Sequence, residues 1–397
     1  MKKLITGIVC EYNPFHNGHL YQLESVKKEG ADAIVCVMSG NFVQRGECAA
    51  IDKWKRAEMA VKCGADVVIE LPTPWACASA ETFARGGVGL LMDFGVDSVS
   101  FGCETADFSL LKKCSEMYKD ESFILLVKEN MSKGMTYPRA VSNAAAILFG
   151  DEISSFVDSP NNTLAVEYMK AVSAFEKEIK IIPVLRRGCA HDSNETLQNF
   201  ASASLLRSMN LNEDIEPFMP KKAYDVVKSA TKSGFAPCNI SFVERAVISS
   251  LRELSKDEYS DYVSDENGLT SRIYEAVQKS DSLSEIYDSV KVKNYTHARI
   301  RREIMMLYLR CQKNLSEGGV PYMKILAVSK RGVSLLKNAK HNSSVPIITK
   351  HSDTQSLDER GKAVYKFECS ATDKFALCSQ KIRACGLEAT HSLKIIE

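Results

Sequence analysis

Two histidines near the start of the chain have the spacing and the setting of a phosphate site. His16 and His19 lie three residues apart, with Gly18 between them, in the run Glu11-Tyr-Asn-Pro-Phe-His-Asn-Gly-His19. An imidazole can donate a hydrogen bond to a phosphate oxygen and stabilise the charge that grows on a departing pyrophosphate, and glycine lets the backbone approach a ligand closely. Two surface histidines in a turn are the plainer alternative, but the position directly after a predicted first strand favours phosphate chemistry.

The elements around this run indicate how it is positioned. Residues 4–10 are apolar and β-branched and predict a strand, and residues 20–29 predict a helix in which Leu20, Leu23 and Val26 share one face. A strand-to-helix turn directs backbone N–H groups and the positive end of the helix dipole toward the carboxyl edge of the sheet. Phosphate groups bind at such an edge.

Strand-like and helix-like runs alternate through the first half of the chain. Buried strands are predicted at residues 33–38, 66–71, 96–101 and 181–185, with helices at 52–63 and 79–93. This alternation is typical of an α/β fold with a Rossmann-like, right-handed parallel sheet and helices on both faces. Ligands bind beyond the carboxyl ends of such strands, so the 11–19 turn, the 39–46 loop, Glu70 and residues 102–104 are expected along one edge.

Further polar residues follow predicted strands or begin predicted helices. They are Gln44 and Arg45 in the 39–46 loop, Asn161 and Asn162 in a first helical turn, Arg186 and Arg187 after the fifth strand, and Ser202, Ser204 and Arg207 at another helix start. Arginines at a strand end suit an anion, and amides in a first turn can recognise a base or ribose. For the loop and the two asparagines, a solvated loop or helix cap is an equal alternative on residue types alone.

The composition is that of an ordinary globular protein without bulk charge. The 397 residues include 51 basic and 50 acidic side chains, so a nucleic-acid contact would have to come from local basic patches. The 13 cysteines include no C-x-x-C pair, which argues against a disulfide framework or a zinc site. The apolar runs are shorter than the ~18–20 residues of a membrane span, and no signal peptide is recognisable. We expect a cytoplasmic protein with neither a membrane nor DNA as its partner.

Beyond about residue 212 the alternation stops. Residues 213–317 look mainly helical, and 318–397 look like a small α/β segment. The most basic stretch places Arg299, Arg301 and Arg302 in the first turns of a helix, where cations oppose the helix dipole. RNA phosphates, with Tyr295 available for stacking, would explain these residues. A solvated polar face explains them equally well.

The run His16-Asn-Gly-His19 resembles the HxGH signature of the nucleotidyltransferase superfamily related to class I aminoacyl-tRNA synthetases. The longer run 11–19, together with Met38-Ser-Gly-Asn-Phe-Val-Gln-Arg-Gly46, resembles the bacterial tRNA(Met) cytidine acetate ligase family. The resemblance extends over essentially the whole chain and is strongest in residues 5–105 and 158–207. An ISSTxIR-like segment at 201–207 lacks the leading Ile and the Thr, and there is no clear KMSKS-like lysine loop.

The resemblance implies an enzyme that activates acetate with ATP as acetyl-adenylate. It would then transfer the acetyl group to N4 of the wobble cytidine in elongator tRNA(Met), forming N4-acetylcytidine and releasing AMP and pyrophosphate. Mg²⁺ would accompany ATP on chemical grounds; no metal-ligand cluster is recognisable in the sequence. The implied organisation is a catalytic domain over 1–212, a helical tRNA-binding region over 213–317 and a C-terminal segment over 318–397.

The resemblance also implies which residues act. The implied catalytic residues are His16, His19 and Arg187. The residues implied to bind ATP are Gly7, Ile8, Val9, Cys10, Glu11, Tyr12, Asn13, Pro14, Phe15, His16, Asn17, Gly18, His19, Leu20, Gly102, Asn162 and Arg187.

Two other functions stay open. An adenylyltransferase acting on another small acid or phosphate would use the same ATP site, although the long chain beyond residue 212 favours a large second substrate. A non-catalytic RNA-binding protein with a vestigial nucleotide domain is the second alternative. The intact histidine run and the pair Arg186-Arg187 argue against such decay.

Overall fold

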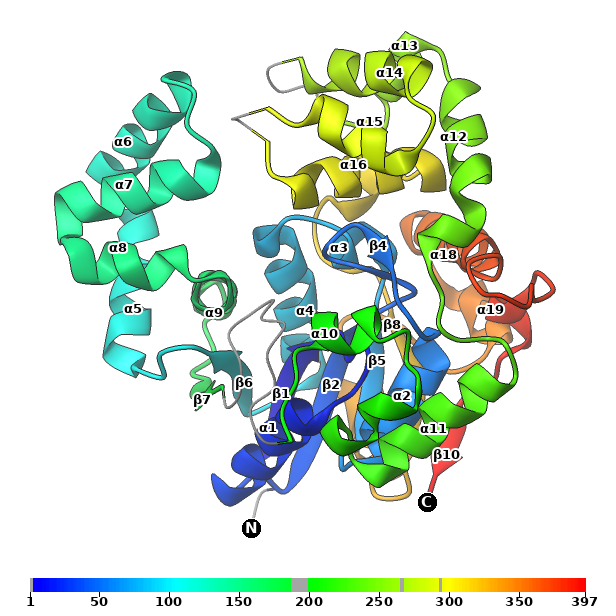
Figure 1. Ribbon diagram of the computed structural model, residues 1–397. Coiled ribbons are helices and arrows are strands. Elements are labelled where there is room, and N and C mark those ends of the chain that lie inside the picture. The colour runs from blue at the N-terminus through cyan, green and yellow to red at the C-terminus, as the bar shows by residue number, and fades with distance from the viewer. Residues whose placement is uncertain (1–2, 187–198, 265–267, 293–294) are drawn as a thin grey trace.

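A central sheet organises the fold (Figure 1). The computed structural model describes residues 3–186, 199–264, 268–292 and 295–397, and its main sheet has the strand order β10-β8-β5-β2-β1-β6-β7, with β9 paired to β8. Five strands are mutually parallel: β1 (Ile5–Cys10), β2 (Ala33–Ser39), β5 (Val67–Leu71), β6 (Ser98–Cys103) and β7 (Lys180–Leu185). The predicted α/β fold with a Rossmann-like parallel sheet is confirmed.

Alternate side chains along the strands face two separate cores, because successive residues of a strand point to opposite faces. Val35, Val37 and Ile69 share one core with the helices α3 (Thr73–Ala76), α4 (Ala80–Phe94) and α9 (Pro160–Ser173). Cys36 and Met38 share the other with α1 (Asn17–Lys28), α2 (Lys53–Lys62), α10 (Ala203–Ser208) and α11 (Lys221–Lys232). The sheet is thus covered on both faces, as the alternation predicted.

Two further groups of helices border α3 and α4, one to their left and one above them in Figure 1. The first group comes between β6 and α9 in the sequence and consists of α5 (Phe108–Glu116), α6 (Glu121–Ser132), α7 (Tyr137–Phe149) and α8 (Asp151–Asp158). The second is the predicted helical region: α12 (Glu244–Arg252), α13 (Lys256–Tyr259), α14 (Leu269–Lys279), α15 (Leu283–Val290) and α16 (His297–Leu309). None of the helices in the described ranges has both the length and the apolar character that crossing a membrane requires.

The remaining elements are short or belong to the C-terminal part. The 39–46 loop contains one strand of a small hairpin of β3 (Phe42–Val43) and β4 (Glu47–Cys48). The short 3₁₀ helices span Met117–Lys119, Glu213–Phe218, Ile240–Val243, Lys313–Ser316 and His351–Ser356. The C-terminal elements are β8 (Met323–Ser329), α17 (Gly332–Asn342), β9 (Ile347–Ile348), α18 (Glu359–Phe375), α19 (Leu387–Thr390) and β10 (Lys394–Ile396).

The C-terminal strands, in the segment 318–397 that was predicted as a small α/β segment, join the main sheet. β8 pairs antiparallel with β5, and β9 and β10 then pair with β8. β8 therefore covers the edge that β5 would otherwise expose to pairing with another chain. The hydrophobic pattern identified β8 as a strand but carried no information on its partner, and the division at residues 212 and 317 stays a prediction.

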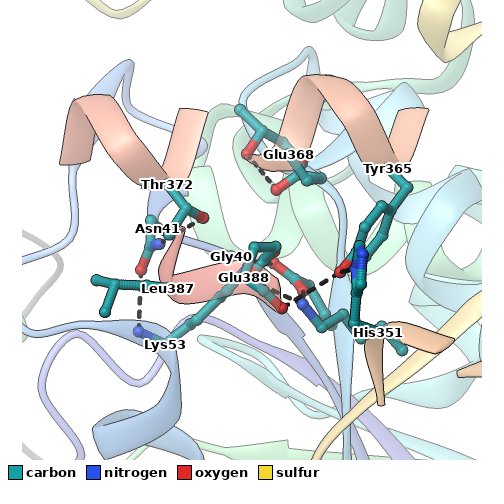
Figure 2. A network of polar contacts seen from close by, with 12 residues as sticks. Gly40, Asn41, Lys53, His351, Tyr365, Glu368, Thr372, Leu387 and Glu388 are labelled. Atoms are coloured by element: carbon teal, nitrogen blue, oxygen red, sulfur yellow. Dashed lines mark hydrogen bonds and ion pairs between the residues drawn. The ribbon is translucent and has the colours of Figure 1, made fainter. Parts of the chain in front are cut away.

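A buried network of charges ties the C-terminal helices to the sheet (Figure 2). The ammonium group of Lys53 contacts the carboxylates of Glu70 and Glu388, and Lys324 lies 2.9 Å from Glu388. Glu368 of α18 accepts hydrogen bonds from the backbone and hydroxyl of Thr73. Glu70, expected at the ligand edge, is therefore used to hold the fold together. The carboxylates of Glu70, Glu368 and Glu388 lie close enough to bind a metal ion, but the two lysines already pair with two of them, Glu70 and Glu388.

Replacing Lys53 by alanine should destabilise the protein strongly. The side chain is fully buried, so its loss leaves two buried carboxylates facing each other, at a cost of about 3–5 kcal/mol. Urea unfolding of Lys53→Ala measures this cost against Lys133→Ala, which breaks an exposed pair with Glu129 and should cost less than about 1 kcal/mol. Equal losses in both variants would contradict a structural role for the network.

The network should also make stability depend on pH. Burial, followed by repulsion from Glu70, raises the pKa of Glu368 from 4.5 to about 8. The native state thus binds a proton that the unfolded state releases, so the free energy of unfolding should fall between about pH 4.5 and pH 8, by at most about 1.4 kcal/mol per pH unit. Urea titrations across this range should show a flatter profile for Glu368→Gln, and the same slope in both proteins would exclude Glu368 as its source.

Candidate active site

The candidate site lies where the strand order of the sheet reverses. β1 has β2 on one side and β6 on the other, and α1 begins shortly after β1 ends. In open α/β sheets, ligands bind at this switch point beyond the carboxyl ends of the strands. One pocket here is lined by His16, Gly18, His19, Tyr21, Gln22, Gly102, Val184, Leu185, Arg186, Phe200, Ala201 and Ser202.

His16 and His19 cap the start of α1 reciprocally. Nδ1 of His16 accepts a hydrogen bond from the Gly18 N–H at 3.0 Å, and Nδ1 of His19 accepts one from the His16 N–H at 3.2 Å. A neutral imidazole whose Nδ1 is an acceptor carries its proton on Nε2. Both rings therefore present an Nε2–H donor, and the helix start gains two of the partners that it needs.

Burial keeps both imidazoles neutral. Removal from water lowers the pKa of His16 to about 3, and the guanidinium groups of Arg186 and Arg207 act in the same direction. Burial lowers the pKa of His19 as well, with smaller effects from His16 and Arg186. At neutral pH the two rings are neutral donors, so positive charge at the site comes from the arginines and from the N-terminus of α1.

Aromatic neighbours hold the His19 ring. The ring centroids of Tyr12 and Phe15 lie 4.8 and 5.5 Å from that of His19, and the His16 ring stacks on it at 3.7 Å. Tyr12, Phe15 and Ile8 have fully or almost fully buried side chains. These apolar members of the 7–20 run therefore support the histidines from the core, and the contact of the run with ATP stays a prediction.

Arg186 is the cation that the described structure brings into the pocket. It follows β7 and donates through Nη1 to Oδ1 of Asn161 at 3.3 Å. Gly102 lies beside it, since a Cβ on Gly102 would be in ordinary van der Waals contact with Cγ of Arg186, at 3.4 Å. The sequence singled out its neighbour Arg187 as catalytic; Arg187 lies outside the described residues, so its role stays a prediction.

Arg207 holds the turn that precedes the histidines. Its Nη1 donates to the carbonyl oxygen of Asn13 at 2.9 Å, and its Nη2 donates to Oγ of Ser204 at 3.2 Å. Arg45 donates to the same hydroxyl at 3.2 Å. Ser202 caps α10 by accepting from the Leu205 N–H, and the predicted helix start at 201–207 is confirmed. Through the bond from Arg207 to Asn13, the segment 201–207 thus holds the β1–α1 turn in position.

Asn162 positions the loop after β6. Its side chain is buried, and Oδ1 accepts hydrogen bonds from the backbone N–H groups of Glu104 at 2.9 Å and Thr105 at 3.3 Å. The Glu104 carboxylate in turn accepts from Asn161 at 2.7 Å and also from Ser159. Asn162 therefore acts on the loop that follows Gly102 and the end of β6, and its predicted contact with ATP stays a prediction. Nothing in the spacing of Glu104 in the sequence indicated this role.

Arg56 joins the β1–α1 turn to the 39–46 loop, and sequence reasoning missed it. This fully buried side chain donates to the carbonyl oxygens of Glu11 and Gly40. The Glu11 carboxylate also accepts from the Gln44 N–H at 2.9 Å. The sequence did contain a signal for this role. Arg56 lies on the apolar side of a predicted helix, and a charged residue there is rarely buried without partners.

The pocket suits a metal ion that arrives with its nucleotide. Among the described lining residues there is no carboxylate. Mg²⁺ commonly keeps several waters and binds substrate phosphates rather than an all-protein cage. A Mg²⁺ ion accompanying ATP would therefore be held here by phosphate oxygens and water.

Gly18→Ala should weaken nucleotide binding without unfolding the protein. A Cβ at this position would lie 2.9 Å from Cε1 and 3.0 Å from Nδ1 of His16, so the ring must move and its Nε2–H donor with it. Losing one such bond to a charged ligand costs about 1.5–3 kcal/mol, or at least about tenfold in affinity for ATP by calorimetry.

Gly89→Ala is the matched control, because its Cβ would meet no atom within 4 Å. Gly89 lies within α4, and the Gly89→Ala variant should bind ATP as the wild type does. Normal ATP affinity in Gly18→Ala would contradict the role assigned to the histidine cap.

Comparison with known proteins agrees with this geometry. The model of the HIGH Nucleotidyl Transferase family matches residues 2–388. A tRNA(Met) cytidine acetate ligase of Caldanaerobacter subterraneus subsp. tengcongensis is 35% identical over 397 residues and covers 98% of both chains. The ligase of the same name from Acetivibrio thermocellus is 34% identical, covering 99% of this chain and all of the relative.

Solved structures extend the similarity to three dimensions. Thermotoga maritima TmcAL in its apo form superposes with a TM-score of 0.92 at 27% identity, and its form bound to alpha-thio ATP superposes with 0.90 at the same identity. Each comparison covers 99% of both chains. The chain belongs to the HIGH nucleotidyl transferase family and, within it, to the tRNA(Met) cytidine acetate ligases.

Proposed function

We propose that this protein activates acetate with ATP and acetylates N4 of the wobble cytidine of elongator tRNA(Met). The observation that carries the nucleotide half of this proposal is the pair of neutral Nε2–H donors at the N-terminus of α1, beside Arg186. The names of the relatives carry the choice of acetate and of tRNA(Met). Because the proposed substrate is a tRNA, we also infer that the protein acts in the cytoplasm.

The first step needs positioning and charge stabilisation more than a side-chain nucleophile. An acetate oxygen attacks the α-phosphorus of ATP, the bond from that phosphorus to the bridging oxygen breaks, and pyrophosphate leaves. His16 and His19 donate to phosphate oxygens as negative charge moves onto the leaving group, and Arg186 adds a positive charge. Neutral donors suit this task because they stabilise growing negative charge without adding a positive charge that the buried site must accommodate.

The second step consumes the acetyl-adenylate. The N4 amino group of cytidine attacks the acetyl carbonyl carbon, AMP leaves, and N4 loses one proton. A mixed anhydride is prone to hydrolysis, so the site must exclude water until the cytidine arrives. A tRNA docked over the carboxyl edge of the sheet would supply that cover.

A direct assay separates this proposal from its alternatives. Purified protein is incubated with ATP, acetate and bacterial tRNA, and AMP, pyrophosphate and tRNA nucleosides are measured. The proposal requires acetate- and tRNA-dependent AMP together with N4-acetylcytidine. Pyrophosphate release without modified tRNA would favour an adenylyltransferase, and no ATP turnover with any small acid or phosphate would favour an RNA-binding protein.

His19→Ala should lower the rate of AMP formation by about 10²–10³-fold, the usual effect of removing one preorganised donor from a developing negative charge. His341→Ala removes an exposed histidine at the end of α17 and should leave the rate unchanged. Full activity of His19→Ala would exclude the assigned chemistry.

A further inference from the structure

A large groove opens between the two outer groups of helices. It measures about 710 Å³, within the range of roughly 300–1,000 Å³ that small organic ligands occupy. One wall comes from α6, α7 and α9, the other from α16 and the segment after it, and the start of α4 contributes to its lining. Figure 1 shows the group α5–α8 to the left of α3 and α4 and the group α12–α16 above them.

Two contacts link the groove to segments beside the nucleotide pocket. Gln44 lines the groove, and its backbone N–H donates to Glu11 at the beginning of the β1–α1 turn. Thr163 of α9 also lines it and directly follows Asn162, which holds the loop after β6. The groove therefore borders residues that support the histidine turn and the end of β6.

The lining combines aromatic rings with charges of both signs. Tyr137 at the start of α7 is 47% exposed, and Tyr262 also lines the groove. The cations are Arg299, Arg302 and Lys313, and the carboxylates are Glu81, Glu167 and Glu303. Glu303 lies 3.8 Å from Arg299, and Glu167 lies 2.8 Å from Lys170.

The structure changes which residues of the basic stretch can meet RNA. Tyr295 is only 2% exposed, so the predicted stacking on this ring is wrong. Arg302 is half-buried and donates to the carbonyl oxygen of Gln44 at 3.3 Å, and Arg301 lies 3.7 Å from Glu47. Arg299 remains at the groove, with its guanidinium group 5.5 Å from the centre of the Tyr295 ring.

We propose that this groove receives the acceptor nucleoside of the tRNA, unstacked from the anticodon loop, with its base against Tyr137 and flanking phosphates near Arg299 and Lys313. The proposal rests on the proposed function and adds the place where the second substrate enters. Unpaired bases of RNA loops are commonly bound by stacking on aromatic side chains, with arginine and lysine on the backbone.

The mixed charge fits one nucleoside better than a duplex. A continuous phosphate backbone laid along the groove would meet Glu81 and Glu167, whereas a single base offers amino groups that carboxylates accept. Carboxylate side chains bind the N4 amino group of cytosine in this way. The groove therefore suits a cytidine flanked by few phosphates.

The test uses Tyr137→Ala and Arg299→Ala with matched controls elsewhere on the surface. Phe242 is an exposed aromatic residue on a 3₁₀ helix, and Arg272 is an exposed arginine of α14. Neither belongs to the lining of the groove. Each variant is measured for ATP affinity by calorimetry, for tRNA affinity by filter binding at several salt concentrations, and for formation of N4-acetylcytidine.

Both groove variants should bind ATP normally and bind tRNA more weakly than their controls. Loss of one stacking ring costs about 1–3 kcal/mol, so Tyr137→Ala should weaken tRNA binding by about 5- to 150-fold. Arg299→Ala should reduce the slope of log affinity against log salt by about 0.7. N4-acetylcytidine formation should fall in parallel at low tRNA concentration.

Normal tRNA affinity in Tyr137→Ala, with ATP binding intact, would overturn the proposal. A changed association state with unchanged tRNA affinity would also overturn it and assign the groove to a protein partner. Failure of the proposed function looks different: wild-type protein would bind ATP and tRNA but form no N4-acetylcytidine, while the variants would still report where RNA binds.

Discussion

The hydrogen bonds that two histidines accept from the start of their own helix determine the state of the nucleotide site. Because Nδ1 of His16 and Nδ1 of His19 are both acceptors, their protons lie on Nε2, and burial keeps both rings neutral. A helix N-terminus already attracts anions. The capping arrangement adds two oriented donors to it, without placing a buried charge beside the arginines.

Much of the surrounding structure serves to keep that turn in one place. Arg207 holds it from α10 through the carbonyl oxygen of Asn13, and Arg56 holds it from α2 through the carbonyl oxygen of Glu11. Lys53, on the same helix as Arg56, joins Glu70 of β5 to Glu388 of α19. A buried ion pair is weak evidence for stability in itself. Its value here is that the carboxylates and lysines accept only one arrangement of the C-terminal part.

The two halves of the proposed reaction are joined by short chains of contacts. Gln44 donates its N–H to Glu11 at the nucleotide turn and accepts from Arg302 of α16 through its carbonyl oxygen. One residue of the 39–46 loop thus lies between the turn that carries the histidines and the helix that borders the groove. An adenylate enzyme benefits from such proximity, because its intermediate must meet the second substrate before it meets water.

The sequence by itself determined the parts of this protein whose interactions are local. The strand before the histidines and the helix after them depend on residues a few positions apart, so the pattern predicted both. The reciprocal histidine cap is equally local, but it was not predicted. The alternation of strands and helices predicted the parallel sheet and its ligand edge for the same reason.

Only the tertiary structure decided the contacts between distant residues. The pair Lys53 and Glu388 is separated by 335 positions, and the pairing of β8 with β5 depended on which sheet edge was left open. Tyr295 looked available for stacking until the packing of α16 buried it. Hydrophobic periodicity specifies which face of an element is buried, but not which partner covers it, and that choice is made by shape and charge complementarity across the whole chain.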